Sequence, residues 1–377
     1  MKVRVACVVE AYPPHVGGSE TRMSELLGRL PKNWEIHVIT PRFDEYPPFE
    51  LSTNITIHRV GNYDSKRYFL NTDRPISDSV KFGIQASREL KKLGRLDISV
   101  FGEWNLLHYV ISERSVDTPK LVDWCEVLAR RLKGVKGLGE ALLEAYLAKR
   151  ASHHTAINTK VAADLNLIHG VPKPKVSVVP NGVHRELLAN SKPEKEYGRI
   201  LFVGRITPHK QPELLIQAAQ HLQSCAFIFV GWGDPAYLDK LKRIAPRNVY
   251  FLGELSRGEL AREYRRAWVF ALPSTREGSS ISALEAMSNY TPVVTVRAPL
   301  NYSVYDAVQD GFNGIVTRND PESFAEGLRK TLVNEKLYQE LSHNAYETAK
   351  HRCWDVLAKR FTEVLESVAI QKHTEEN

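Results

Sequence analysis

The sequence predicts an α/β protein made of two doubly wound domains, each with a parallel sheet covered on both faces. Short apolar runs, typical of buried strands, alternate with stretches of helical periodicity in both halves of the chain. The length of 377 residues exceeds the roughly 250 to 300 residues at which a single core stops growing. A polar segment with prolines and glycines, from Pro180 to Gly198, interrupts the alternation and is the expected hinge.

The predicted strands follow one another along both halves of the chain. In the first half they occupy Val3–Val9, Ile36–Ile39, Ile55–Val60, Ile98–Phe101 and Lys120–Val122. Later they occupy Val176–Val179, Arg199–Val203, Ala226–Val230, Val249–Leu252, Val269–Leu272 and Pro292–Val296. We therefore expect an N-terminal domain at 1–185 and a C-terminal domain at 198–350. Apolar residues at helical intervals predict a last helix at 354–369.

The composition is that of a soluble globular protein, with 43% hydrophobic and 25% charged residues. No run of about 18 apolar residues is present to span a membrane. The apolar start of the chain lacks the cleavage site of a signal peptide, so we expect a cytoplasmic protein. The cysteines have no CxxC spacing and indicate neither a disulfide framework nor a zinc site; they are Cys7, Cys125, Cys225 and Cys353.

Most of the net charge of +7 lies in residues 1–190, with a dense basic stretch at 128–150. Apolar residues in this stretch recur at helical spacing, including Leu138, Leu142 and Tyr146. Two interpretations remain open: an ordinary surface helix with a solvated basic face, or a basic amphipathic helix that contacts an anionic membrane or an acidic acceptor. The isoelectric point of 9.1 does not by itself indicate nucleic-acid binding, because the charge is not interleaved with aromatic stacking residues.

Two glutamates, Glu277 and Glu285, bracket a Gly-Ser-Ser turn that follows the predicted strand 269–272 and enters a helix. Ligands bind at the carboxyl ends of strands in open α/β sheets, so both carboxylates are candidates to line one cleft. Ser279 or Ser280 can cap the helix, which leaves the N–H groups of Ser280 and Ile281 for an anion. The alternative is a chance spacing of two common residues.

Two further loops are candidates to bind phosphate. One follows the first strand of the N-terminal domain, and the other follows the first strand of the C-terminal domain. In the first loop, Gly17 and Gly18 can adopt backbone angles closed to other residues, and Ser19 can cap the next helix. In the second loop, Arg205 offers a planar fork for phosphate oxygens and Lys210 a mobile positive charge. The alternatives are a plain tight turn and solvated surface charges.

A third loop, after strand 226–230, contains Gly231 and Gly233. This GxG lacks the third glycine of a dinucleotide fingerprint, so a simple turn is an equal alternative to close approach of a ligand. Leu252 lies at the end of the next predicted strand and is a candidate to contact the base of a nucleotide.

Taken together, these motifs resemble the retaining glycosyltransferases of family 4, which have the GT-B architecture of two facing Rossmann-like domains. The resemblance extends over nearly the whole chain. It is carried by Pro13–Glu20, Val179–Val183, Gly204–Lys210, Gly231–Gly233, Glu277–Glu285 and Asp310–Gly314. It also implies that the last helix packs back on the N-terminal domain.

The resemblance implies transfer of a sugar from a nucleotide-diphosphate sugar, a UDP- or GDP-sugar, to an acceptor hydroxyl with retention at the anomeric carbon. It implies no required metal or other cofactor. Arg205 and Lys210 would bind the diphosphate, Glu285 the ribose hydroxyls and Glu277 the transferred sugar, so the implied catalytic residues are Glu277, Arg205 and Lys210. The implied donor-binding set is Gly17, Gly18, Arg205, Lys210, Gly231, Leu252, Gly278, Ser279, Ser280, Ile281 and Glu285.

The acceptor side departs from the family. Many relatives carry a histidine where this chain has Val122 to Glu126, and another where it has Gly102-Glu103-Trp104. Asp123 or Glu126 is a candidate to hold the sugar or the acceptor, with a structural turn as an equal alternative. The acceptor is expected to be a glycan or a lipid-linked sugar, at the cytoplasmic membrane face if the basic helix contacts lipid. Two rival functions stay open: a sugar phosphorylase or nucleotide-sugar epimerase of the same fold, and a non-catalytic subunit that binds sugar nucleotides.

Overall fold

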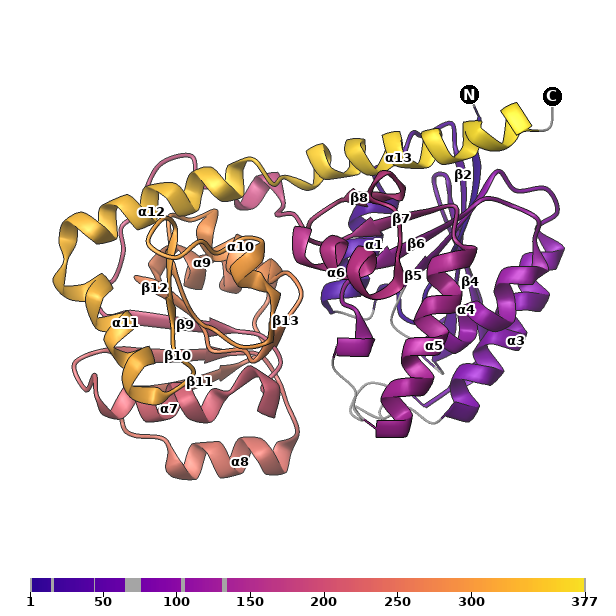
Figure 1. Ribbon diagram of the computed structural model, residues 1–377. Helices are drawn as coiled ribbons and strands as arrows, with labels where there is room; N and C mark the ends of the chain where they lie inside the picture. Colours follow the sequence, from indigo (N-terminus) through magenta and orange to yellow (C-terminus); the bar gives the residue numbers. More distant parts are fainter. Residues whose placement is uncertain are drawn as a thin grey trace. The chain divides into compact units, whose positions relative to one another are not determined.

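The computed structural model describes residues 2–14, 17–43, 45–64, 76–102, 106–130 and 134–375. The chain divides into two compact units, each with its own sheet (Figure 1). The first unit comprises Met1–Pro180 together with Asp355–Asn377, and the second comprises Asn181–Trp354. The chain thus leaves the first unit once and returns to it with its last helix.

The first unit contains an eight-stranded sheet of order β3-β4-β2-β1-β5-β6-β7-β8. All neighbouring strands pair in parallel except β3, which is antiparallel to β4 at the edge. The strands are β1 (Arg4–Val8), β2 (Glu35–Phe43), β3 (Phe49–Ser52), β4 (Ile55–Tyr63), β5 (Ile98–Gly102), β6 (Lys120–Trp124), β7 (His153–Ala156) and β8 (Val176–Val178). The helices are α1 (Gly18–Leu27), α3 (Ile76–Lys92), α4 (Leu106–Ser112), α5 (Gly134–Arg150), α6 (Thr159–His169) and the last helix, α13 (Trp354–Glu375).

The second unit contains a parallel six-stranded sheet of order β11-β10-β9-β12-β14-β16 and a separate two-stranded pair, β13-β15. Its strands are β9 (Arg199–Val203), β10 (Ala226–Val230), β11 (Val249–Gly253), β12 (Val269–Leu272), β13 (Arg276–Glu277), β14 (Val293–Val296), β15 (Leu300–Asn301) and β16 (Gly314–Thr317). Its helices are α7 (Pro212–Gln220), α8 (Pro235–Ile244), α9 (Arg257–Arg266), α10 (Ile281–Met287), α11 (Pro321–Val333) and α12 (Glu335–Lys350).

Both faces of the second sheet are covered, as the apolar runs predict. In β9, Ile200 and Phe202 belong to one hydrophobic cluster while Leu201 belongs to another. Successive side chains of a strand point to opposite faces, so the two clusters lie on opposite sides of the sheet. Each cluster includes residues of the flanking helices, for example Leu215 of α7 in one and Leu284 of α10 in the other. The prediction of a doubly wound α/β fold is confirmed.

The last helix is tied to the first unit by an ion pair between Arg29 Nε and Asp355 Oδ1 at 2.9 Å. Helix α1 begins at Gly18. None of the described helices combines the length and apolar character needed to cross a membrane.

Candidate functional site

The loops that follow β9 and β12 are fastened together in the second unit. Thr275 donates two hydrogen bonds to the carbonyl oxygen of His209, from its backbone N at 2.9 Å and from Oγ1 at 3.1 Å. This places the Lys210 ammonium in an ion pair with the Glu277 carboxylate. The two side chains are only 18% and 12% exposed, so water weakens their attraction less than it would at an open surface. The sequence predicted both residues for one site, and the structure brings them into contact.

Arg205 lies on the same loop as Lys210 and is half-buried. Within the described residues its guanidinium makes no hydrogen bond or ion pair. Its donors are therefore available to a ligand with phosphate oxygens, which a planar guanidinium binds two at a time.

Gly231 and Gly233 have a packing role that the sequence did not reveal. The loop after β10 lies against the loop after β9, with Gly204 N donating to Val230 O at 3.0 Å and Ile206 N donating to Trp232 O at 2.7 Å. A Cβ at Gly231 would collide with the carbonyl oxygen of Gly204, and the residue has a φ of +131°. Close contact between two loops, and not only approach of a ligand, therefore requires glycine at this position.

Glu285 lies in α10 and is held by a neighbouring helix. The hydroxyl of Tyr264, on α9, donates to Glu285 Oε2 at 2.7 Å. Burial raises the pKa of the Glu285 carboxyl from 4.5 to about 7, against the opposing effects of the Tyr264 hydroxyl and the charge of Arg257. A half-buried carboxylate with one oxygen held in place can accept hydrogen bonds from two adjacent hydroxyls.

The two serines in the turn between Glu277 and Glu285 have different roles. Ser280 caps α10, because its Oγ accepts a hydrogen bond from Ala283 N at 3.3 Å. Ser279 does not cap the helix; its Oγ donates to Asp306 Oδ2 at 2.6 Å. Ile281 is the first residue of α10, and Gly278 precedes the two serines. Leu252, on β11, is 41% exposed.

The glycine loop of the first unit differs from the prediction. Gly17 has extended backbone angles, with φ −168°, and neither Gly17 nor Gly18 has a positive φ. Gly17 is also the N-cap of α1, so the expectation that Ser19 caps this helix is wrong. Ser19 instead lies in the first turn and donates from Oγ to Glu20 Oε2 at 3.2 Å. The expected close approach of this loop to phosphates stays a prediction, and His15 and Val16 lie outside the described residues.

Asp123, a candidate for the acceptor side, is engaged inside the protein. Arg22 donates to both of its carboxylate oxygens, from Nε and Nη2, at 2.8 Å each, and Thr155 Oγ1 donates to Oδ1 at 2.6 Å. The side chains of Arg22 and Asp123 are 1% and 3% exposed. These contacts favour the structural alternative for Asp123. Glu126 is half-buried, and its part in acceptor binding stays a prediction. Glu103 and Trp104 lie outside the described residues.

The basic stretch forms helix α5, and two of its leucines point outward. Leu138 and Leu142 are 63% and 64% exposed, whereas Leu147 is buried. Lys149 is exposed at the end of the helix. Arg131 and Lys133 lie outside the described residues, as does the side chain of Lys136.

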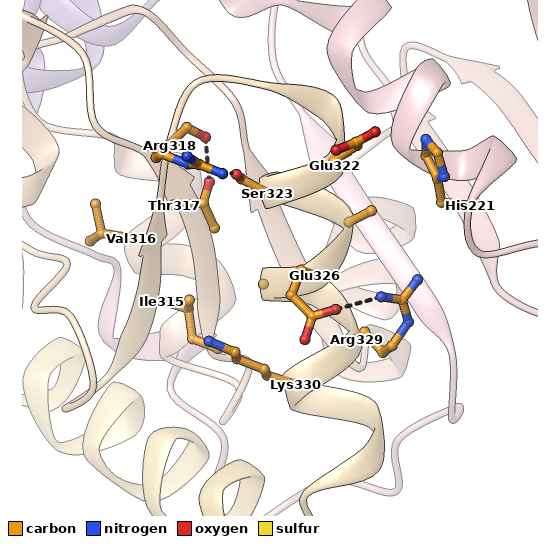
Figure 2. A pocket seen from close by; sticks show the side chains of 12 residues that line it. His221, Ile315, Val316, Thr317, Arg318, Glu322, Ser323, Glu326, Arg329 and Lys330 are labelled. Carbon is orange, nitrogen blue, oxygen red and sulfur yellow. Dashed lines mark hydrogen bonds and ion pairs between the residues drawn. The ribbon is translucent and has the colours of Figure 1, made fainter.

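A cavity of about 520 Å³ lies elsewhere in the second unit, beside α11 (Figure 2). Its lining comes from α11, β16 and the end of α7, and it includes the ion pair of Glu326 with Arg329. None of the predicted site residues lines this cavity. Its charges are mixed and its position is not at the loops described above, so we do not assign the site to it. Among the described residues, no group of three or more His, Cys, Asp or Glu side chains is arranged to hold a metal ion.

Three residues that contact the predicted site residues were not predicted from the sequence. Tyr264 gave no signal, because a tyrosine on an amphipathic helix is most often a core residue. Asp306 lies in a segment without a recognised motif. Asn181 belongs to the Pro-Asn-Gly segment that carried the resemblance, but its contact could not be foreseen: its Nδ2 donates to Ser279 O at 2.9 Å.

Known proteins resemble this chain over both of its units. Two family profiles match adjacent parts of the chain, "Glycosyltransferase Family 4" at residues 16–187 and "Glycosyl transferases group 1" at residues 184–348. An uncharacterized glycosyltransferase of Methanocaldococcus jannaschii is 26% identical over 367 residues, which is 95% of this chain and 97% of that protein.

Two solved structures share the fold over 97% of this chain, each at 16% identity. One is sucrose-phosphate synthase from Thermosynechococcus elongatus, with a TM-score of 0.78 over 99% of that chain. The other is HepE of Anabaena in complex with UDP-glucose, with a TM-score of 0.73 over 100% of that chain. The chain therefore belongs to the family 4 glycosyltransferases and has their GT-B fold.

Proposed function

We propose that this glycosyltransferase moves a sugar from a nucleotide-diphosphate sugar to an acceptor hydroxyl with retention of the anomeric configuration. The contact between Lys210 and Glu277, beside an Arg205 that has no partner among the described residues, carries this proposal. A cation beside a carboxylate at a strand end suits a substrate that has a diphosphate next to a polar sugar. The solved relative with UDP-glucose bound supports a nucleotide sugar as the donor.

In the proposed reaction Arg205 and Lys210 stabilise the negative charge that builds on the departing diphosphate. This is the largest change of charge in the reaction, and prearranged cations act on it without reorganisation. Lys210 has three donors on its ammonium, so it can bind a phosphate oxygen while it keeps Glu277. Glu277 orients the sugar and supports positive character at its anomeric carbon.

Glu285 holds the ribose hydroxyls in this proposal. The turn from Gly278 to Ile281 lies between the two carboxylates in the sequence and presents its amides to the donor. The acceptor hydroxyl enters on the face that the diphosphate leaves, without a covalent enzyme intermediate. Gly17 and Gly18 are proposed to border the phosphates, and Leu252 and Gly231 to border the nucleoside.

The experiment that tests the proposal begins with a panel of UDP- and GDP-sugars, scored by thermal shift and by slow hydrolysis. With the donor identified, Glu277→Ala should abolish transfer while binding of the nucleoside diphosphate survives. Glu254→Ala is the matched control, because Glu254 is exposed and is not a predicted site residue. Turnover that survives in Glu277→Ala refutes the role of Glu277, and tight nucleotide binding by the wild type without transfer from any donor favours a non-catalytic subunit.

We further propose that the acceptor is a glycan or a lipid-linked sugar at the cytoplasmic face of a membrane, with α5 touching anionic lipid. The exposed Leu138 and Leu142, one helical turn apart, support this proposal together with the basic charge of the stretch. Wild-type protein should sediment with vesicles that contain anionic lipid and not with neutral vesicles. Leu138→Ser/Leu142→Ser should lose this binding, whereas Leu167→Ser, which changes an exposed leucine on α6, should keep it. Equal sedimentation of wild type and the double variant would exclude α5 as the contact.

A further inference from the structure

Ser279, in the turn proposed to face the donor, is fixed from two sides. Its backbone carbonyl accepts a hydrogen bond from Asn181 Nδ2 at 2.9 Å, and its hydroxyl donates to Asp306 Oδ2 at 2.6 Å. Ser279 is 6% exposed and Asn181 is 2% exposed. Hydrogen bonds in such buried positions are costly to break, because the separated groups would remain without water.

Asp306 is in turn held by Arg352. Nη1 of Arg352 donates to Asp306 Oδ1 at 2.6 Å, and Nη2 donates to the backbone carbonyl of Asp306 at 3.0 Å. The Asp306 side chain is 3% exposed and that of Arg352 is 20% exposed. Two charge-assisted hydrogen bonds from one planar group fix both the side chain and the backbone of Asp306.

The two ends of this chain of contacts lie where the polypeptide passes between the units. Asn181 is the first residue of the second unit, and Arg352 lies two residues before its last, Trp354. The two crossing segments are also joined to each other. Val183 N donates to Arg352 O at 2.8 Å, and Trp354 N donates to Val183 O at 3.1 Å. One crossing therefore contacts Ser279 directly through Asn181, and the other is connected to it through Arg352 and Asp306.

We propose that Asn181, Asp306 and Arg352 are positioning residues that couple the two crossings to the donor turn at 278–281. A rearrangement of the backbone at the crossings moves Asn181 and Arg352, and through them the carbonyl and the hydroxyl of Ser279. Movements between domains are commonly absorbed by a few residues at such crossings, and closure commonly completes a site. The inference rests on the proposed function in one respect, that the turn at 278–281 contacts the nucleotide sugar.

The first test needs no ligand. Hydrogen–deuterium exchange of the free protein is measured for the amides of 278–281 in wild type, Arg352→Met and Arg352→Lys. We expect exchange about tenfold faster in Arg352→Met, since the two charge-assisted bonds are lost, and an intermediate rate in Arg352→Lys, which keeps the charge. The strands β9, β10 and β12 should keep their wild-type rates.

The matched control is Lys350→Met, which removes an exposed cation two residues away whose side-chain hydrogen bonds go to Glu347 on its own helix. It should leave the amides of 278–281 at their wild-type rates. The double variant Asp306→Asn/Arg352→Met should exchange at about the rate of Arg352→Met, since the effects of residues in one contact chain are not additive. Unchanged exchange at 278–281 in Arg352→Met, or an equal rise throughout the second unit, would overturn the proposal.

The second test uses the donor found in the nucleotide-sugar panel. In wild type, bound donor should slow exchange at 278–281 and also at Val183 and Trp354, because coupling between two sites acts in both directions. In Arg352→Met the donor should still protect 278–281 but no longer the two crossing amides. Protection of the crossings that survives in this variant contradicts the proposal. If wild type binds no nucleotide sugar, the proposed function fails, and the exchange rates of the free protein still decide whether the contacts position the turn.

Discussion

The affinity for a nucleotide sugar should fall as the pH is lowered through 7, because the proposed ribose ligand must be ionised to accept two hydrogen bonds. Burial raises the pKa of Glu285 to about 7 in the free protein. Binding to the carboxylate alone predicts that affinity falls about tenfold between about pH 8 and pH 6, as the ionised fraction drops from about nine-tenths to about one-tenth. The ligand must be an intact nucleotide sugar, because the terminal phosphate of a free nucleoside diphosphate itself titrates near about pH 6.

Isothermal titration calorimetry of the wild type, Glu285→Gln and Tyr264→Phe at several pH values measures this dependence. Glu285→Gln should bind weakly and with no dependence on pH in this range. Tyr264→Phe removes a donor that favours the ionised carboxylate, so its midpoint should move to higher pH. A wild-type affinity that is constant from about pH 8 to pH 6, or a Glu285→Gln variant that keeps the dependence, would refute the assignment of Glu285.

The raised pKa of Glu285 also makes the stability of the fold depend on pH. The folded pKa of Glu285 lies above the ordinary 4.5, so the folded protein holds a proton that the unfolded chain releases between pH 4.5 and about 7. Stability from this group therefore falls as the pH rises through that window, by about 3 kcal/mol at most. Glu285→Gln should unfold at a higher denaturant concentration than wild type at about pH 8 and at a similar one near pH 4, which would show that the carboxylate is kept at a cost to stability.

Three further predictions concern buried groups and packing within the two units. Burial lowers the pKa of Lys195 from 10.5 to about 7, so the folded protein gains stability as the pH rises between these values; Lys195→Met should lose this dependence in urea unfolding. Gly231→Ala should lower the free energy of unfolding by more than about 2 kcal/mol, whereas Gly258→Ala, in open space on α9, should raise it by up to about 1 kcal/mol. Asp123→Asn should cost about 3 to 5 kcal/mol in thermal unfolding, because it leaves the Arg22 charge buried without its partner.

The sequence predicted most of the strands whose residues are buried, but it missed β7, which is largely buried although its His-His-Thr start is polar. β9, β10, β12 and β14 are largely apolar runs, and each was placed to within about a residue. β3 was missed because its two apolar residues, Phe49 and Leu51, are too few in a four-residue edge strand to give a clear pattern. β16 was missed because it has only four residues and begins with a glycine.

The approach of Lys210 to Glu277 could be predicted from the sequence, because both follow parallel strands of one sheet and such loops meet at one edge. The contact of Tyr264 with Glu285 could not. It joins two helices through side chains that are 21 positions apart, and nothing in the local pattern of either helix distinguishes it from ordinary packing.

A glycine in a loop can have either of two physical causes, and only the structure distinguishes them. A ligand that approaches the backbone and a neighbouring loop that does so both exclude a Cβ, so Gly231 gives the same signal in either case. The structure assigns the exclusion at Gly231 to the carbonyl of Gly204. Because Gly204 immediately precedes Arg205, this loop contact fixes the backbone from which the Arg205 guanidinium extends. Gly231 therefore helps to position Arg205 at the proposed diphosphate site without any need to contact the donor.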